Sequence, residues 1–289
     1  MDYYNLLKKY KYHMILVIIL IFFFLLYYYI MRNKFKRVVV FDLDETIGCF
    51  QQFGIFCDAI EKQRKRKLTR NDFVEILDLY PEYFRPHIFE IMKFLKQKKI
   101  KGDLHRLCLY TNNNGPKEWA RRICLFIDNK IDYKLFDNHI GAYMVNGLQI
   151  EPMRTTYDKT VKDFLRTTRL PKHTEICFID DLYHEKMDDG NVYYIHVEPY
   201  TIILPTSILV ERYYQYFNPY MPYNDFYNII NNYMKRYNLS DLHNKKNIDH
   251  DLNGKNILSH LENFIQPISK STRRNKHESK NKSVKRQII

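Results

Sequence analysis

The middle of the chain alternates short apolar runs with longer amphipathic stretches. The runs are rich in β-branched and aromatic residues, which is typical of buried strands. They cover residues 38–41, 107–110, 175–179 and 192–197. Apolar residues at helical spacing predict helices over residues 88–98, from Trp119 onward and over residues 158–165. Strands that alternate with helices predict an α/β protein with a doubly wound, Rossmann-like parallel sheet and helices on both faces.

The first run ends in two acidic residues, Asp42 and Asp44, separated by Leu43. Residues two apart in an extended segment share a face, so both carboxylates should point the same way. Two adjacent carboxylates repel unless a cation lies between them or one is protonated. The first case suits Mg²⁺, which binds oxygen ligands, and the second suits general acid catalysis. The alternative is a polar turn after a strand, because Asp and Thr are common turn residues.

Two further strand ends carry polar side chains of the same kind. The run at 107–110 is followed by Thr111, and the run at 175–179 by Asp180 and Asp181. An Asp-Asp pair alone is more often the start of a loop. In doubly wound sheets, however, ligands bind at the carboxyl ends of the strands. Three polar strand ends therefore predict one functional site.

The N-terminal region contains an uncharged aliphatic and aromatic run over residues 14–31, about long enough to cross a bilayer. Both flanks are basic, and no cleavage site of a signal peptide follows. The flank at 32–37 is slightly the more basic, which favours a cytosolic C-terminal domain. The prediction is a single-pass membrane anchor with the C-terminal domain in the cytosol.

The remaining segments are expected to surround this domain. Residues 51–67 turn polar and then basic, which predicts a solvated helix face or loop. Residues 47–84 look too polar to build a separate core that could cover the site at the strand ends, so this site should lie in an open cleft. A helix should start at Asn71-Asp72, and Asn146-Gly147 predicts a hairpin. Residues 208–237 are Tyr-rich and amphipathic, which predicts helix. The basic composition from residue 240 onward predicts a disordered tail, able to meet nucleic acid or anionic lipid.

The charge and cysteine content narrow the class only slightly. The chain has 46 basic and 33 acidic residues among 289, a formal charge of +13. Its five cysteines form no CxxC pair and leave one over. Most of them lie in apolar patterns, where a free cysteine packs as a small hydrophobe. We therefore expect a reducing compartment and no zinc site.

The strand-end motifs together resemble the haloacid dehalogenase superfamily of phosphohydrolases. The resemblance rests on DLDET at 42–46, the Thr at 111, a downstream Lys and the Asp-Asp pair at 180–181. With Arg85-Pro86-His87, DLDET looks like the branch of the NLI-interacting-factor-like proteins, which contains the RNA polymerase II C-terminal-domain phosphatases. Three longer segments, YTNNNGPKEW, EPMRTTYDKT and EICFIDDLYH, look like the version in large DNA viruses. The resemblance covers about residues 36–205.

The resemblance implies a role for each matching residue. Asp42 matches the nucleophile that accepts the phosphoryl group, and Asp44 the acid/base that serves the leaving oxygen and then water. Thr111 matches the hydroxyl that binds the phosphoryl oxygens. Lys159 matches the cation that neutralises charge around the phosphate, although Lys162 is near enough to take that role instead.

The resemblance also implies a Mg²⁺ cofactor. Asp180 and Asp181 match the acidic pair that holds it, together with Asp42 and the backbone carbonyl of Asp44. The chain departs from the cellular phosphatases in residues 112–114, where three asparagines follow Thr111. These asparagines should line the rim of the cleft, and Asn112 should contact the substrate.

The leading hypothesis is a membrane-anchored, Mg²⁺-dependent phosphatase that acts on phosphoserine or phosphothreonine in a protein. Its catalytic domain should face the cytosol, and its membrane should be that of a host cell or virion if the protein is viral. Two alternatives stay open: a non-catalytic binding or translocase-type subunit with the same fold, and a nucleotide or polynucleotide phosphatase. The predicted divisions are a basic flank at 1–13, the anchor at 14–31, the phosphatase domain at 32–205, a helical extension at 206–239 and the basic tail at 240–289.

Overall fold

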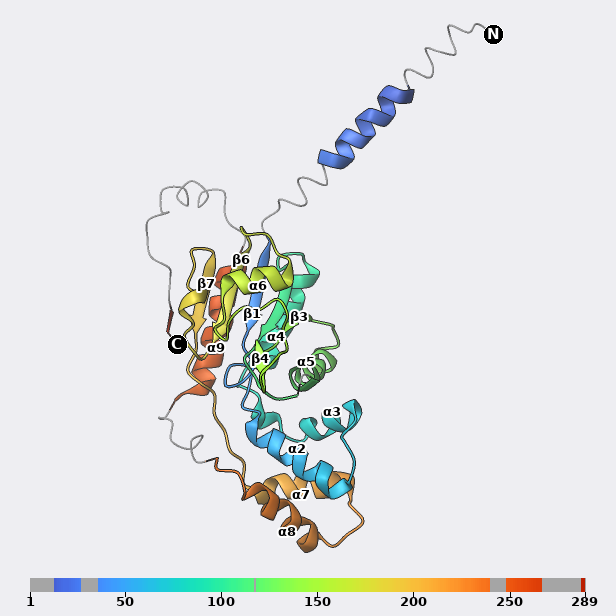
Figure 1. Ribbon diagram of the computed structural model, residues 1–289, viewed down its shortest axis with the longest axis vertical. Helices are drawn as coiled ribbons and strands as arrows, with labels where there is room; N and C mark the ends of the chain where they lie inside the picture. Colours follow the sequence, from blue (N-terminus) through green and yellow to red (C-terminus); the bar gives the residue numbers. More distant parts are fainter. Residues whose placement is uncertain (1–12, 27–35, 117, 240–247, 267–286, 289) are drawn as a thin grey trace, which may run out of the picture. The chain divides into compact units, whose positions relative to one another are not determined.

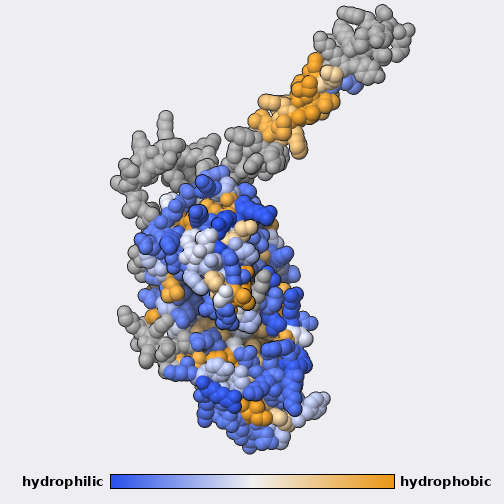
Figure 2. All heavy atoms as spheres, viewed as in Figure 1, coloured by the Kyte–Doolittle hydropathy of each residue, from blue (hydrophilic) through white to orange (hydrophobic). Residues whose placement is uncertain are grey.

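The computed structural model describes residues 13–26, 36–116, 118–239, 248–266 and 287–288, which form two compact units divided after Lys36 (Figure 1). In the first unit, residues 13–26 form a helix with exposed, mostly apolar side chains (Figure 2). No helix in the described ranges is long and apolar enough to cross a membrane. The predicted anchor is thus not supported there, and its residues 27–31 lie outside the described residues, as do the first twelve.

The second unit is built on a parallel sheet with the strand order β3-β2-β1-β6-β7. Its strands are β1 (Arg37–Phe41), β2 (Arg106–Tyr110), β3 (Phe136–Ile140), β6 (Glu175–Asp180) and β7 (Val192–His196). A two-residue strand, β8 (Gln287–Ile288), pairs with the outer edge of β7. β1 is central and pairs with both β2 and β6. Its residues 38–41 are buried and alternate between the two faces of the sheet, as an apolar run predicts.

Helices cover both faces of the sheet (Figure 1). Val39 and Phe41 of β1 belong to a core that includes α4 (Ile88–Ile100), α5 (Glu118–Ile131) and α9 (His250–Ile265). The alternate residues Val38 and Val40 belong to a smaller core on the other face, with α6 (Val161–Thr168). The predicted α/β architecture with a parallel sheet between helices is therefore confirmed.

Four further helices form a group at one end of the unit (Figure 1). They are α2 (Gln51–Arg64), α3 (Arg70–Asp78), α7 (Thr206–Phe217) and α8 (Tyr223–Met234), with the 3₁₀ turn η1 (Pro81–Tyr83) between α3 and α4. Residues 47–84 form no separate core, as expected, but they are less polar than expected and bury many apolar side chains in the core that also covers the sheet. Phe53 packs on Phe73 and Phe56 on Tyr213, so this segment shares its apolar residues with α7 and α8.

Two local differences from the predicted elements matter for the site. Strand β3 was not predicted, because its sequence FDNHI has little apolar character. Helix α6 begins at Val161 rather than at 158, because the Thr160 side chain accepts a hydrogen bond from the Asp163 amide and caps the helix. Lys159 therefore lies in a loop. The hairpin of β4 (Met144–Val145) and β5 (Leu148–Gln149) turns at Asn146-Gly147, as predicted.

Helix α9 lies inside the segment predicted to be a disordered tail. It buries Ile257, Leu261 and Ile265, whose four-residue spacing places them on one face of the helix. The overall polar composition concealed this helical period. Residues 240–247 and 267–286, which include most of the basic tail, lie outside the described residues.

Candidate active site

The loop after β1 places Asp42 and Asp44 on the same side. Asp42 continues the strand through its amide, which donates to the Ile179 carbonyl oxygen (2.9 Å). Leu43 is fully buried and points the other way, as the alternation in an extended segment predicts. Glu45 then adopts a positive φ of 59°, which ends the extended run, and both aspartates line one cavity.

Arg85 stabilises the backbone of this loop through hydrogen bonds. Its buried guanidinium donates to the carbonyl oxygens of Thr46 (2.6 Å), Glu45 (2.6 Å) and Glu198 (2.8 Å). The Thr46 hydroxyl in turn donates to the Asp181 carboxylate (2.8 Å) and accepts from the Asp181 amide (3.0 Å). The end of β1 is therefore tied to the end of β6.

Three carboxylates meet where these strand ends approach. Asp42, Asp180 and Asp181 each offer an oxygen, and these oxygens lie within 4.8 Å of one another. Burial, reinforced by neighbouring carboxylates, raises the pKa of Asp42 and that of Asp181, the latter to about 6. The site thus holds more negative charge than its surroundings neutralise, and its hard oxygen donors suit a divalent cation. These three residues would hold such an ion.

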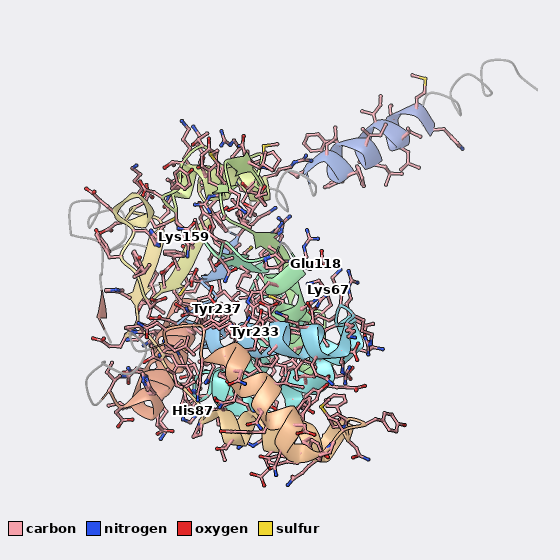
Figure 3. All side chains as sticks on the ribbon, turned by 60° about the horizontal axis from the view of Figure 1, so that its bottom comes forward. Lys67, His87, Glu118, Lys159, Tyr233 and Tyr237 are labelled. Carbon is pink, nitrogen blue, oxygen red and sulfur yellow. The ribbon has the colours of Figure 1, made fainter. Side chains whose placement is uncertain are left out.

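Lys159 lies between two of the carboxylates. Its Nζ donates to Asp180 Oδ2 (2.7 Å) and to Asp42 Oδ1, and the side chain is only 2% exposed. Burial alone would lower the pKa of Lys159, but Asp42 and Asp180 outweigh it and raise that pKa, so the ammonium stays charged. Figure 3 shows Lys159 beside the strands of the sheet. The other candidate, Lys162, is exposed on α6.

Asp180 has a second polar neighbour in His184. The His184 Nε2 lies 3.5 Å from Asp180 Oδ2, and the imidazole lines the same cavity. Burial would raise the pKa of Asp180, but Lys159 and His184 together lower it, which keeps this carboxylate ionised.

Asp44 is oriented by an asparagine of the loop after β2. Asn113 Nδ2 donates to Asp44 Oδ2 (2.6 Å), while its Oδ1 accepts from the Gly115 amide (2.7 Å). The Asn113 amide donates to Thr111 Oγ1 (3.0 Å), so the threonine hydroxyl belongs to the same turn. Burial raises the pKa of Asp44, although the Asn113 hydrogen bond opposes the shift. A carboxyl group of this kind can hold a proton and release it.

The predicted rim residue Asn112 also contacts a buried arginine. Asn112 lines the cavity, but its side-chain oxygen accepts a hydrogen bond from Arg154 (2.8 Å). Sequence reasoning expected Asn113 at the rim of the cleft but assigned no role to Thr46, His184 or Arg154. These three residues lie within the segments DLDET, EICFIDDLYH and EPMRTTYDKT that carry the resemblance. Their contacts depend on the fold.

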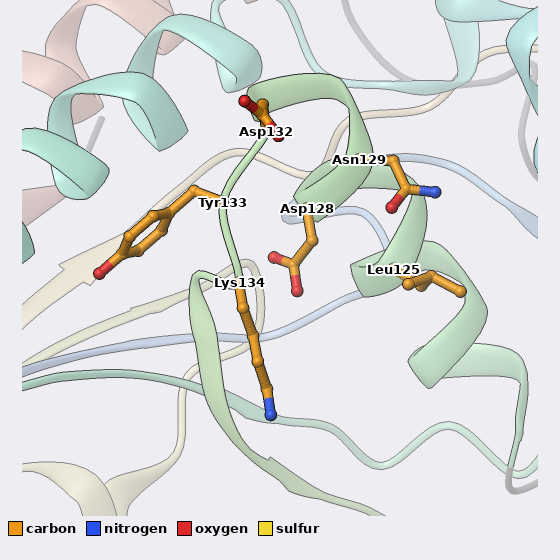
Figure 4. A pocket seen from close by; sticks show the side chains of 6 residues that line it. All are labelled: Leu125, Asp128, Asn129, Asp132, Tyr133 and Lys134. Atoms are coloured by element: carbon orange, nitrogen blue, oxygen red, sulfur yellow. The ribbon is translucent and has the colours of Figure 1, made fainter.

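The candidate residues line a single cavity of about 420 Å³. Its lining consists of Asp42, Asp44, Glu45, Thr111, Asn112, Asn113, Lys159, Asp180, Asp181, Leu182 and His184. A second hollow, of about 490 Å³, lies beside the C-terminal end of α5 (Figure 4). Its Asp128 carboxylate accepts a hydrogen bond from the Leu135 amide (3.0 Å) and thus holds the loop before β3. The chemistry of the strand ends therefore points to the first cavity.

Comparison of the sequence with models of known protein families and with curated proteins finds no match. The class of protein can therefore be described only from its fold and its candidate site. The second unit is an α/β domain whose parallel sheet carries, at its strand ends, a buried acidic cluster able to bind a metal ion.

Proposed function

We propose that this protein is a Mg²⁺-dependent phosphatase that works through a phosphoryl group carried on Asp42, as the resemblance to the haloacid dehalogenase superfamily implies. One observation carries the proposal. The charged Lys159 lies between Asp42 and Asp180 in a cavity that also contains Asp44 and Thr111. A nucleophile, an acid/base, a hydroxyl donor and a cation therefore surround one space.

In the first step, a carboxylate oxygen of Asp42 attacks phosphorus and the bond from phosphorus to the leaving oxygen breaks. Asp44 gives its proton to that oxygen, which its raised pKa favours. In the second step, water attacks phosphorus and Asp44 takes up a proton from it. The bond between Asp42 and phosphorus breaks, and inorganic phosphate leaves. Splitting the displacement in this way replaces one difficult step by two easier ones.

The remaining residues stabilise the charge that builds up on the phosphoryl oxygens. Lys159 supplies a fixed positive charge, and the Thr111 hydroxyl supplies a hydrogen-bond donor, both inside a partly buried space where such interactions are strong. A Mg²⁺ ion held by Asp42, Asp180 and Asp181 would neutralise further charge on the phosphoryl group and the nucleophile.

The lining of the cavity favours a phosphorylated protein segment as the substrate. Lys159 comes from the loop before α6, and every other residue that lines the cavity comes from the end of a sheet strand or the loop that follows it. Among the described residues, none of the lining comes from α2, α3, α7 or α8, the helices that lie outside the sheet. Because no second domain covers the nucleophile there, an extended chain can reach it.

The full chain should be assayed with Mg²⁺ against phosphopeptides, nucleotides and 4-nitrophenyl phosphate. We expect phosphate release that EDTA abolishes, a higher kcat/KM for phosphopeptides than for nucleotides, and inhibition by fluoroberyllate. Asp42→Asn should remove the activity while leaving the Tm close to that of the wild type. Activity retained by D42N, or no phosphate release from any of these substrates, would refute the proposal.

A further inference from the structure

Arg154 is a buried arginine close to the candidate active site, with 1% of its surface exposed. Its guanidinium makes five hydrogen bonds, all to uncharged oxygens. Nη1 donates to Asn112 Oδ1 (2.8 Å), Gly141 O (2.8 Å) and Thr111 O (3.4 Å), and Nη2 donates to Tyr157 O (2.8 Å) and Asp158 O (3.1 Å). The acceptors belong to three loops: those after β2 and β3, and the one before α6.

This arrangement has an energetic cost. Carbonyl and amide oxygens solvate a cation but do not neutralise it, and burial lowers the pKa of Arg154. The Tyr110 ring, 4.9 Å from the guanidinium carbon, offsets part of the cost through a cation–π contact. An apolar side chain of the same volume would avoid the free-energy cost of burying a charge, but it would leave the carbonyl oxygens without hydrogen-bond donors. The planar fork of arginine is the side chain that can serve three loops at once.

The contacts of Arg154 bear on two groups of the cavity. On one side, it holds the backbone of Thr111 and the side chain of Asn112. On the other, it holds the carbonyl oxygens just before Lys159, while the Tyr110 hydroxyl accepts from the Thr160 amide (3.2 Å) just after it. Lys159 is therefore fixed from both sides, and the same guanidinium sets its place relative to Thr111.

We propose that Arg154 is a positioning residue that couples the Thr111 loop to the Lys159 loop and so sets the spacing of the two groups that bind the phosphoryl oxygens. The part of this inference that concerns phosphate rests on the proposed function. Apart from its ion pairs with Lys159, the acidic cluster is held by β1, β6 and the contacts of Thr46 and Arg85. Loss of the Arg154 contacts should therefore weaken phosphoryl binding without weakening metal binding.

The test compares Arg154→Lys with Arg166→Lys in the full chain. Lysine keeps the charge but cannot span three loops. Arg166 is a matched control, because it also donates to a carbonyl oxygen of this segment, that of Met153, but makes no contact with the Thr111 loop. The readouts are hydrogen exchange, calorimetric binding of Mg²⁺, fluoroberyllate binding in the presence of Mg²⁺, and kcat and KM.

For R154K we expect faster exchange in residues 111–115 and in residues 155–160 together, with residues 42–46 unchanged. We expect kcat to fall roughly 100-fold, the order seen for misplaced catalytic groups. Fluoroberyllate affinity should fall about tenfold, since a lost charge-assisted contact of 1.4 kcal/mol corresponds to that factor. Mg²⁺ affinity should be unchanged, and R166K should match the wild type in all four readouts.

Faster exchange in only one of the two loops, or unchanged fluoroberyllate affinity in R154K, would overturn the coupling. Should R154K be too unstable to purify, Arg154→Gln offers a neutral variant with the same readouts and expectations. Wild-type protein that binds Mg²⁺ but neither binds fluoroberyllate nor releases phosphate would refute the proposed function. The exchange comparison would then still decide whether Arg154 couples the loops.

Discussion

Asn113 donates a hydrogen bond from its side-chain amide to the carboxylate of Asp44 over 2.6 Å. The two residues lie at the ends of different strands, and the contact joins the loop that carries the threonine hydroxyl to the proposed acid/base. Because Asn113 is itself held by the Gly115 amide, its orientation is set before any substrate arrives.

The first prediction concerns this contact. The Asn113 hydrogen bond lowers the pKa of Asp44, so Asn113→Ala should raise it further and shift the pH profile of kcat to higher pH. We also expect kcat to fall about tenfold for alkyl phosphates, because Asp44 loses its orientation. The loss should be smaller for 4-nitrophenyl phosphate, whose leaving group needs no proton. Equal losses for both substrates, with an unshifted profile, would contradict the assigned role.

The second prediction separates the two lysines. Lys159→Ala removes the charge between Asp42 and Asp180, so kcat/KM should fall by roughly 10²–10³-fold, the range found when one transition-state donor is removed. Lys162→Ala should behave as the wild type, because Lys162 is exposed on α6. Steady-state kinetics and Tm values for both variants provide the measurement. A large loss of kcat/KM in K162A would show that Lys162, and not Lys159, is the functional lysine.

The third prediction concerns pH and the metal ion. The pKa of Asp181 is about 6, raised by burial and by Asp180. A proton therefore competes with the cation below pH 6, and Mg²⁺ affinity should fall as the pH is lowered from 7.5 to 5. Calorimetry in two buffers of different ionisation enthalpy should detect proton release near pH 6. Asp181→Asn should weaken Mg²⁺ binding and reduce this proton release, and unchanged proton release in D181N would contradict the assignment.

The same shift has a consequence for stability without metal. The folded protein binds the Asp181 proton more tightly than the unfolded chain, so this group favours folding at low pH and opposes it increasingly between about pH 4 and 6. In EDTA, the contribution of Asp181 should therefore lower the Tm over this range. Mg²⁺ should restore the loss above pH 6, and D181N should remove the dependence. A Tm difference between wild type and D181N that does not change with pH would rule out this linkage.

The fourth prediction concerns the packing of α9. A Cβ built on Gly254 would lie 2.4 Å from the Pro86 carbonyl oxygen, which is backbone and cannot turn aside. Gly254→Ala should therefore lower the free energy of unfolding by about 1–3 kcal/mol, the usual cost of overpacking. The exposed Ser259 of the same helix provides the control, and S259A should change stability little. Denaturant unfolding of both variants tests this, and equal stability would show that α9 packs elsewhere.

Short-range patterns predicted the parts of the fold that depend on neighbours in sequence. The alternation of Asp42, Leu43 and Asp44 and the apolar run before it placed the central strand and both carboxylates correctly. Helix α9 escaped notice because the polar composition around it outweighed three apolar residues at helical spacing. Strand β3 was not predicted because it lies at the edge of the sheet, where a strand needs fewer apolar side chains.

The site showed the same division. Candidate residues that follow an apolar strand could be found from the sequence. For the lysine of the site, the sequence left two candidates, Lys159 and Lys162. The distinction between them depends on where α6 begins, which the Thr160 cap decides. The contacts of Arg154 could not be predicted, because Thr111, Asn112 and Gly141 lie in other loops. The contacts of such a buried cation become visible only when the strand order is known.

The pairing of β1 with β6 also determines when the acidic cluster can form. Thr46 and Asp181, which join the two strand ends, are 135 positions apart. Ordering a loop of this length is slow, since its entropic cost precedes the contacts that repay it. We therefore expect β1 and β6 to pair after the folding transition state, so that the complete set of metal ligands exists only in the native protein. Mg²⁺ should then slow unfolding while leaving the refolding rate nearly unchanged.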